Sequence, residues 1–218
     1  MIKLHLFDMD NTLVGVDSDF TWKEFLVKEQ LAPESALETA AKLRNARLAG
    51  KFDAAEYVKF QLAEFKGKTK PDMLKIAAKY FEEVVKPAIY QSAFDYVKQL
   101  LRSGEQVAML TTVNSVIAYH VALYFGITDY IATVPELDGW FFTGDSVKLY
   151  PCGNAKLFYL GSLCERYNLN ASEVAVYSSA VSDLPLFEIA GKQVAVNPGT
   201  ILAQYAGGRS WEIADWKN

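Results

Sequence analysis

Residues 2–13 of the chain read Ile-Lys-Leu-His-Leu-Phe-Asp-Met-Asp-Asn-Thr-Leu, and this stretch decides the fold. Apolar side chains stand at every second position from Ile2 to Leu6, which is typical of a short β-strand. Asp8 follows the strand at once, and Asp10 lies two positions further on. The stretch therefore predicts a strand whose carboxyl end carries two carboxylates.

The segment after this strand has a different pattern. From about residue 19 to residue 85, apolar residues recur at helical spacing and no strand pattern interrupts them, which predicts three or four successive helices. Breaks between these helices are expected at Ala32-Pro33, at Gly50 and at residues 67–71.

From Ser92 onward, helical and strand patterns alternate along the chain. This order predicts an α/β protein with a parallel sheet, and we find no internal repeat. The expected elements are a helix over 93–101, a strand over 106–110, a helix over 115–125, a strand over 130–134, a hairpin around 140–147, a helix over 155–167, a strand over 174–177, a helix over 184–190 and a strand over 193–196.

Polar side chains follow several of these strands. Open parallel sheets bind ligands beyond the carboxyl ends of their strands, so these side chains are expected to converge. They are Asp8 and Asp10, Thr111 and Thr112, and Asp183, with Lys156 at the start of a helix. Such a set of carboxylates, hydroxyls and an ammonium is suited to a phosphoryl group and a metal ion.

The two aspartates suggest a specific chemistry. Because Asp8 and Asp10 are two residues apart, both side chains point the same way if the strand continues to the edge. Two close carboxylates favour a cation between them, and oxygen ligands suit Mg²⁺. One carboxylate could attack phosphorus while the other protonates the leaving alcohol and later activates water. Thr111 could hydrogen-bond a phosphate oxygen, and Lys156 could neutralise its charge.

Each of these residues also has an ordinary structural explanation. A lone Asp-x-Asp is often part of a solvated loop, and a Thr at a strand end or a Lys near a helix start is common. Asp183 precedes Leu184-Pro185, so it could instead be the N-cap of a helix that has proline in its first turn.

Composition excludes several other classes. With 22 Lys and Arg against 26 Asp and Glu, the chain has a formal charge of -4, so nucleic acid is not an expected partner. Cys152 and Cys164 form no redox or zinc motif, and the count suits a reducing cytoplasm. His5 and His120, the only histidines, leave little material for a Ser-His-Asp triad or a His-rich metal site.

No membrane or export segment is expected either. Asp8 and Asp10 interrupt the apolar N-terminal residues before a signal-peptide core could form. No stretch approaches the ~18 uninterrupted apolar residues of a membrane helix.

The order of these motifs resembles the haloacid dehalogenase-like (HAD) superfamily. Residues 6–13 resemble its first motif, a strand followed by Asp-x-Asp-x-Thr, and Thr111, Lys156 and Asp183 resemble its second, third and fourth motifs. The helical stretch between the first two motifs resembles the cap of subfamily IB, the phosphoserine phosphatase-like branch. The resemblance implies a Rossmann-like core over 1–15 and 89–218 and an inserted α-helical cap over 16–88.

The resemblance also implies a function. It implies a Mg²⁺-dependent phosphomonoester hydrolase that acts on a small phosphorylated metabolite, such as phosphoserine or histidinol phosphate, through an aspartyl phosphate. Asp8 takes the nucleophile role and Asp10 the acid/base role. Thr111, the Thr112 backbone and Lys156 hold phosphate, while Asp8, Asp10 and Asp183 hold the metal.

The fourth motif departs from the family pattern. Family members carry a metal-ligating aspartate four positions before the residue that matches Asp183, and here that position is Ser179. A hydroxyl is a poorer partner for a hard cation, so weaker Mg²⁺ binding is expected. One alternative function is therefore a catalytically impaired member that binds a phosphorylated ligand or a protein without turnover. Another is a phosphotransferase that passes the phosphoryl group to an alcohol.

The helical segment offers fewer clues to the substrate. Nine Lys or Arg lie between Lys42 and Lys75 against four acids, which could attract an anion but also fits a solvated helix surface. Asp17 and Asp19 lie where a substrate amine could be met, although Asp19 equally suits a helix N-cap. The oligomeric state and the substrate stay open.

Overall fold

The computed structural model describes residues 1–217, and its main sheet has six strands. Every neighbouring pair in this sheet runs parallel. In spatial order the strands are β3 (Asp129–Thr133), β2 (Gln106–Asn114), β1 (Leu4–Phe7), β6 (Val174–Ser178), β7 (Lys192–Val196) and β8 (Glu212–Ala214). The parallel order confirms the predicted α/β class.

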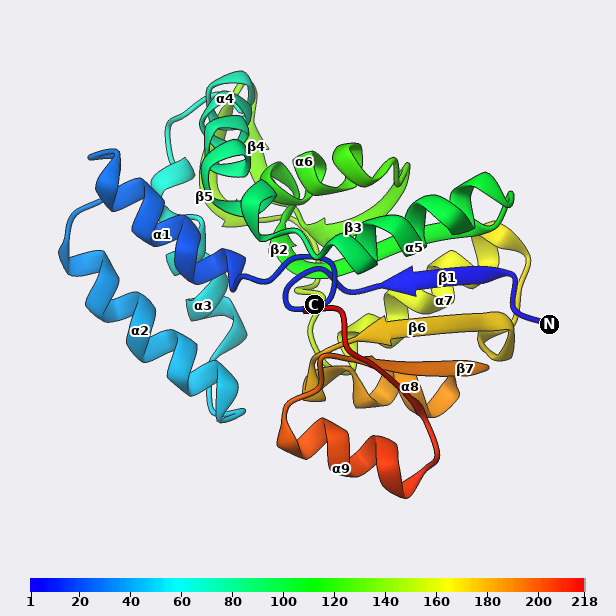
Figure 1. Ribbon diagram of the computed structural model, residues 1–218. Coiled ribbons are helices and arrows are strands. Elements are labelled where there is room, and N and C mark those ends of the chain that lie inside the picture. The colour runs from blue at the N-terminus through cyan, green and yellow to red at the C-terminus, as the bar shows by residue number, and fades with distance from the viewer. Residues whose placement is uncertain (218) are drawn as a thin grey trace.

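Helices cover both faces of the sheet (Figure 1). They are α5 (Gln91–Arg102) and α6 (Ser115–Phe125) on one face, and α7 (Ala155–Tyr167), α8 (Leu184–Ile189) and α9 (Thr200–Gly208) on the other. Side chains of β1 alternate between the two layers, with Phe7 in the first and Leu4 and Leu6 in the second. All three are essentially buried, which explains the apolar run of this strand.

The sequence pattern predicted most of these elements, but it predicted none after the strand at 193–196. Helix α9 and strand β8 lie beyond the last predicted strand, and the short strand β8 is at one edge of the sheet. None of the helices within residues 1–217 combines the length and the apolar character needed to cross a bilayer.

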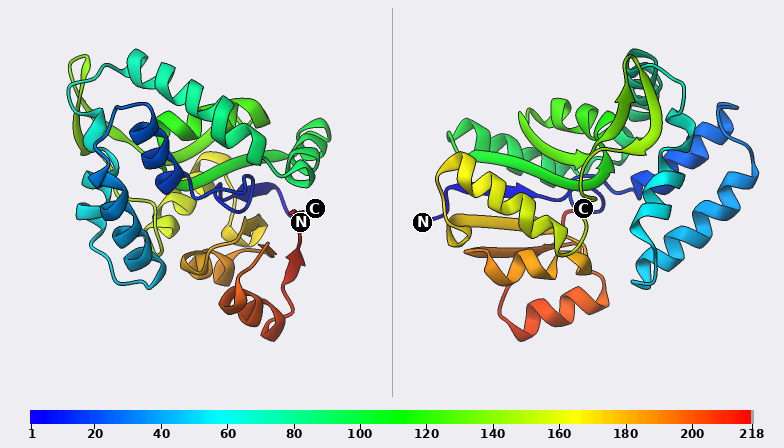
Figure 2. Two further views of the ribbon diagram at one scale, coloured as in Figure 1. Left: turned by 60° about the vertical axis from the view of Figure 1, so that its left-hand side comes forward. Right: turned by 180° about the vertical axis from the view of Figure 1, so that it is seen from behind.

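A group of helices between β1 and α5, which we call the cap, stands at one end of the sheet (Figures 1 and 2). It contains α1 (Ser18–Lys28), α2 (Ser35–Leu48), α3 (Ala54–Gln61), η1 (Ala63–Phe65), α4 (Lys70–Tyr80), η2 (Phe81–Val85) and η3 (Lys86–Ala88). The predicted breaks at 32–33 and 50 fall between α-helices of this group, whereas the predicted break at 67–71 overlaps the first two residues of α4, where proline is accommodated in the first turn.

Side-chain N-caps start three of the cap helices. Asp17, Asp53 and Thr69 each accept a hydrogen bond from a backbone N–H three residues later. The N-cap of α1 is thus Asp17, so the expectation that Asp19 caps this helix is wrong. Asp19 lies in the first turn instead, where its side chain is free to point toward the core.

A β-hairpin links the cap to the core. It consists of β4 (Pro135–Asp138) and β5 (Phe141–Ser146), and it therefore begins earlier than the hairpin predicted around 140–147. Phe142 donates its N–H to the Lys68 carbonyl at 2.9 Å and accepts from the Gly67 N–H at 2.9 Å. The Phe65 and Phe142 rings meet edge to face at 5.3 Å. The hairpin therefore holds the cap against the sheet.

Candidate active site

The loop after β1 presents two carboxylates at the edge of the sheet. The Asp8 N–H donates to the Tyr177 carbonyl of β6 at 2.9 Å, which fixes this residue at the strand end. The next residues turn tightly, with the Leu13 N–H bonded to the Met9 carbonyl at 2.8 Å. Met9 and Leu13 are fully buried, while Asp8 and Asp10 line a cavity.

Two hydroxyl residues, Thr111 and Thr112, lie within β2, which runs to Asn114 and not to residue 110 as predicted. The pairing of β2 with β3 is irregular between Leu110 and Asn114. Thr111 is 1% exposed, and its Oγ1 accepts a hydrogen bond from the Val113 N–H at 3.2 Å. The Thr111 hydroxyl proton is thereby left to donate elsewhere. Both Thr111 and Thr112 line the cavity that Asp8 and Asp10 line.

Lys156 joins two aspartates from separate strand ends. Its Nζ donates to Asp8 Oδ1 at 3.0 Å and to Asp183 Oδ2 at 2.8 Å, and the Ser178 hydroxyl donates to the same Asp183 oxygen at 2.7 Å. Burial alone would lower the pKa of Lys156, but the Asp183 and Asp8 charges raise it, so the lysine stays charged. Burial raises the pKa of Asp8, and Lys156 opposes that rise.

The structure brings five of the six predicted site residues into one cavity of about 590 Å³ between the sheet and the cap. These five are Asp8, Asp10, Thr111, Thr112 and Lys156. The sixth, Asp183, lies behind Lys156 and is 1% exposed. Asp183 is the N-cap residue of α8, with proline in the first turn as expected, but its side chain makes no capping hydrogen bond and is directed to Lys156 instead.

Ser18 is a part of the site that sequence reasoning missed. It is the first residue of cap helix α1, and both oxygens of Asp10 accept hydrogen bonds from it, at 2.7 Å from the backbone N–H and 2.6 Å from the hydroxyl. Burial and the charge of Asp17 raise the pKa of Asp10 well above its usual range, and the Ser18 hydrogen bonds oppose this. Ser18 therefore orients Asp10 and ties it to the cap.

Ser179 stands next to the carboxylate loop. Its hydroxyl donates to the backbone carbonyl of Asp10 at 3.1 Å, and its N–H donates to Thr12 Oγ1 at 3.0 Å. These bonds hold the loop after β6 against the loop after β1. The hydroxyl thus donates to one lone pair of the Asp10 carbonyl oxygen, and the second lone pair is left for a cation.

Several oxygen atoms near Asp8 and Asp183 are candidate ligands for Mg²⁺. Asp183 Oδ1 is buried without a hydrogen-bond partner, and the Asp8 carboxylate and the Asp10 carbonyl lie nearby in the network. Within residues 1–217 no group of three or more His, Cys, Asp or Glu side chains is arranged to hold a metal. Mg²⁺ commonly binds through one or two carboxylates, waters and substrate phosphate, so this donor set fits it.

The cap side of the cavity carries two arginines. Asp17 Oδ2 accepts from Arg44 Nε at 2.9 Å and from Arg47 Nη2 at 3.1 Å. Asp17 also caps α1, so its carboxylate is fully engaged. The expectation that Asp17 meets a substrate amine therefore has little support in this geometry.

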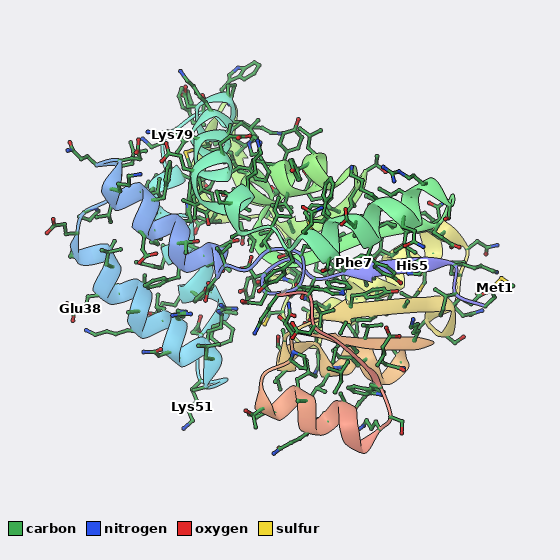
Figure 3. The ribbon with its side chains drawn as sticks, viewed as in Figure 1. Met1, His5, Phe7, Glu38, Lys51 and Lys79 are labelled. Carbon is green, nitrogen blue, oxygen red and sulfur yellow. The ribbon has the colours of Figure 1, made fainter. Side chains whose placement is uncertain are left out.

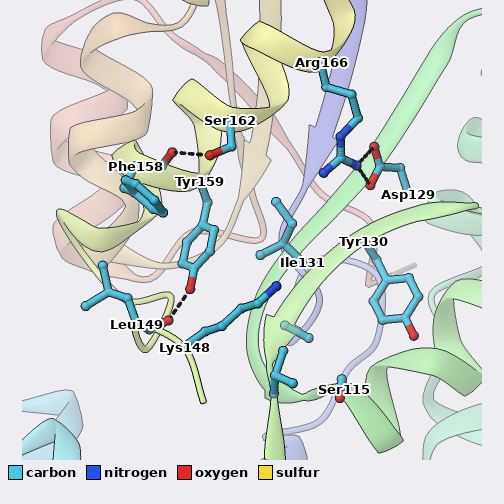
Figure 4. Close-up of a pocket in the computed structure, with 12 residues that line it drawn as sticks. Ser115, Asp129, Tyr130, Ile131, Lys148, Leu149, Phe158, Tyr159, Ser162 and Arg166 are labelled. Atoms are coloured by element: carbon cyan, nitrogen blue, oxygen red, sulfur yellow. Dashed lines mark hydrogen bonds and ion pairs between the residues drawn. The ribbon is translucent and has the colours of Figure 1, made fainter. Parts of the chain in front are cut away.

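Other polar features lie away from these groups. His5 is on β1, toward the strand end remote from the cap, and bonds the Tyr177 hydroxyl at 2.9 Å (Figure 3). A cavity of about 750 Å³ lies beside edge strand β3 (Figure 4). Arg166 there is bonded to both oxygens of Asp129, at 2.5 and 2.6 Å, and Lys148 is the remaining charged residue in the lining. This second cavity lacks the aspartate pair.

A parallel sheet with an aspartate pair after its first strand, a buried lysine and a helical cap defines a class of capped α/β hydrolases. The chain belongs to the haloacid dehalogenase-like hydrolase family, whose model matches residues 5–188.

Two similar proteins of this family are named as phosphatases. A histidinol-phosphatase from Neisseria meningitidis serogroup C (strain 8013) is 30% identical over 225 residues, covering 100% of both chains. The phosphoserine phosphatase SerB1 of Mycobacterium tuberculosis (strain ATCC 25618 / H37Rv) is 27% identical, covering 97% of this chain and 70% of its own. The chain groups with the phosphatases of the family.

Solved structures share the fold. A Bordetella pertussis Tohama I protein described as having unknown function has a TM-score of 0.90 at 26% identity, covering 99% of this chain and 100% of its own. A phospho-aspartyl intermediate analogue of phosphoserine phosphatase has a TM-score of 0.69 at 19% identity, covering 100% of this chain and 94% of its own.

Proposed function

We propose that this protein is a Mg²⁺-dependent phosphomonoester hydrolase that acts on a small phosphorylated metabolite through an aspartyl phosphate on Asp8. The observation that carries the proposal is the convergence of Asp8, Asp10, Thr111 and Lys156 on one cavity beneath the cap. The relatives named histidinol-phosphatase and phosphoserine phosphatase support a small amino-alcohol or amino-acid phosphate as substrate.

In the first step a carboxylate oxygen of Asp8 attacks phosphorus, and the bond from phosphorus to the ester oxygen breaks. Asp10 gives its proton to the departing alkoxide, a role that its raised pKa favours. The Thr111 hydroxyl and the Lys156 ammonium bind the phosphoryl oxygens, whose charge grows as the bond breaks.

In the second step water attacks the phosphorus of the aspartyl phosphate and transfers its proton to Asp10. The bond from phosphorus to the Asp8 oxygen breaks, which releases inorganic phosphate and restores both carboxyl groups. Asp8, the Asp10 carbonyl and Asp183 would hold Mg²⁺, which supplies positive charge that offsets repulsion between the Asp8 carboxylate and the substrate phosphate.

A screen of phosphate release from phosphorylated metabolites, with Mg²⁺ and with a chelator, tests this function. The proposal expects turnover with Mg²⁺ and loss of turnover with the chelator. Transfer of phosphate to added alcohols in place of water would indicate a phosphotransferase. No turnover of any phosphomonoester would contradict the proposal.

Ser179 favours a second candidate, a family member that binds phosphorylated ligands without turnover. Replacing Ser179 by Asp should tighten Mg²⁺ binding about tenfold or more, because the new carboxylate adds a charged oxygen beside the Asp10 carbonyl. Isothermal titration calorimetry with Mg²⁺ measures this directly. Ser179→Asn is the control, because asparagine has nearly the size of aspartate but no charge, and it should not tighten Mg²⁺ binding. If wild type is inactive and Ser179→Asp turns over, the second candidate is correct.

Removing the Ser18 hydroxyl should change the pH dependence of the reaction. That hydroxyl stabilises the charged form of Asp10, so Ser18→Ala should raise the Asp10 pKa and move the alkaline limb of the kcat/KM profile upward by about one pH unit. The kcat should fall about tenfold because one orienting hydrogen bond to a charged group is lost. Ser18→Thr should restore both values. An unchanged pH profile in Ser18→Ala would show that Ser18 does not act on Asp10.

A further inference from the structure

The cavity beside edge strand β3, which we call the β3 cavity, lies between that strand, helix α7 and the segment before α7 (Figure 4). Its volume of about 750 Å³ is within the ~300–1,000 Å³ range of small-molecule sites. Among residues 1–217, none lines both this cavity and the catalytic cavity. We propose that the β3 cavity is a second ligand site, which binds a small carboxylate with an apolar ring or chain through the Lys148 ammonium. This inference is independent of the proposed phosphatase function.

The walls of the β3 cavity are largely apolar. Ile131 and Ala132 belong to β3, Val134 follows it, and Leu149 and Phe158 come from the opposite side. Leu149 is 56% exposed and Phe158 is 64% exposed, although both side chains are large and apolar. Burying such side chains under an apolar ligand is favourable, by about 25 cal/mol for each Å² removed from water. The walls therefore favour a ligand with an apolar body.

The charged side chains of the lining leave one positive charge in excess. They are Lys148, Arg166 and Asp129. Both oxygens of Asp129 accept from Arg166 Nη1, and the Tyr167 hydroxyl donates to Asp129 Oδ2 at 3.0 Å, so this aspartate and this arginine neutralise each other. Lys148 takes part in no ion pair among residues 1–217, and its side chain extends across the cavity toward Ile131 (Figure 4). A ligand with one negative charge balances the lining.

Hydrogen bonds within the chain hold the walls in place without a ligand. The Tyr159 hydroxyl donates to the Leu149 carbonyl, which ties α7 to the segment that carries Lys148. The Ser162 hydroxyl donates to the Phe158 carbonyl at 3.2 Å. Because these two hydroxyl protons are engaged, they do not compete with Lys148 for the ligand. A wall fixed in advance also lowers the entropy lost on binding.

The single excess charge favours a carboxylate over a phosphate. A carboxylate carries one negative charge, whereas a phosphomonoester carries between about 1.5 and 2 at pH 7. The residues 129–132 line the cavity consecutively, although side chains of a strand alternate between its faces, so the cavity follows the free edge of β3. An edge strand has unpaired backbone N–H groups on its free side, and such a group can donate to the second carboxylate oxygen.

The test compares two probes of the same shape in the full wild-type chain. NMR titration gives Kd for 3-phenylpropionate and for 3-phenylpropionamide, its neutral counterpart. The acid should bind about tenfold more tightly, because a hydrogen bond between two charged groups is stronger than one to a neutral amide. Lys148→Gln should reduce this ratio to near one, and Lys148→Arg should keep it. Lys59→Gln, which changes an exposed lysine of α3, is the control and should leave the ratio unchanged.

Two further variants test the apolar wall and the location of the site. Phe158→Ser should weaken the binding of both probes several-fold without changing their ratio, because an apolar contact is lost. Asp8→Asn removes a negative charge from the catalytic cavity, so a carboxylate bound there would gain affinity. The proposal expects an unchanged Kd in this variant. Thermal melts check that each variant is folded.

Several results would overturn the inference. They are a wild-type ratio near one, a ratio that persists in Lys148→Gln, and tighter binding of the acid in Asp8→Asn. Light scattering that shows a dimer which Phe158→Ser dissociates, together with no binding of the acid, would also overturn it, since a second copy of the chain would then cover the β3 cavity. Turnover of phosphomonoesters is scored separately, so a failure of the phosphatase function leaves these binding results unaffected.

Discussion

Replacing Asp8 by Asn should reduce phosphate release by at least about 10³-fold, because the amide oxygen is a far weaker nucleophile than the carboxylate. The substitution preserves size and keeps a polar group beside Lys156, which still has Asp183 as a partner at 2.8 Å. The folded structure should therefore persist. Steady-state release of inorganic phosphate measures the rate, and a thermal melt checks the fold.

A matched control separates this effect from a general loss of charge. Asp145→Asn changes an exposed aspartate of β5 and should keep full activity. If Asp8→Asn retains the wild-type rate while folded, Asp8 is not the nucleophile and the covalent route is wrong.

Replacing Lys156 by Met should cause the largest loss of stability, about 3–5 kcal/mol near pH 7. The ammonium is 2% exposed, and without it the buried carboxylates of Asp8 and Asp183 lose their shared cation. Phosphate release should also fall by at least about 10²-fold, because a charge on the phosphoryl oxygens is lost. Urea unfolding measures the stability.

The loss of stability in Lys156→Met should depend on pH in a definite direction. Lys156 has a folded pKa above its unfolded value, so its contribution is present below about pH 10.4 and is lost as pH rises through the folded pKa. The pKa of Asp8 is already raised by burial, and removing Lys156 raises it further. The variant should thus be less destabilised near pH 5, where Asp8 can take up a proton. Lys148→Met, at an exposed loop position, is the control and should be nearly neutral.

The sequence predicted the site best where a polar residue directly follows an apolar strand pattern. Asp8 follows an alternating strand and Thr111 follows an apolar run, and parallel strands bring such ends to one edge whatever the details of packing. Asp183 also follows a strand, β6, whereas Lys156 reaches it from the start of α7, 27 positions earlier in the chain.

Contacts between the cap and the core were beyond sequence reasoning. Ser18 reaches Asp10, and Gln61 lines one small cavity together with Tyr150, through the docking of helices whose relative placement no spacing rule specifies. The short strand β8 was missed because three residues carry too little periodicity to be recognised. Asp17 illustrates the same limit, since its arginine partners come from a different helix.

The most direct test of the account is chemical trapping of the covalent intermediate. A rapidly quenched reaction is treated with borohydride, which reduces an acyl phosphate on aspartate to homoserine, and peptide mass spectrometry locates the modified residue. A covalent route through Asp8 predicts homoserine at position 8, formed only with substrate and absent in Asp8→Asn. Substrate turnover with an unmodified residue 8, or with the modification at another aspartate, would contradict it.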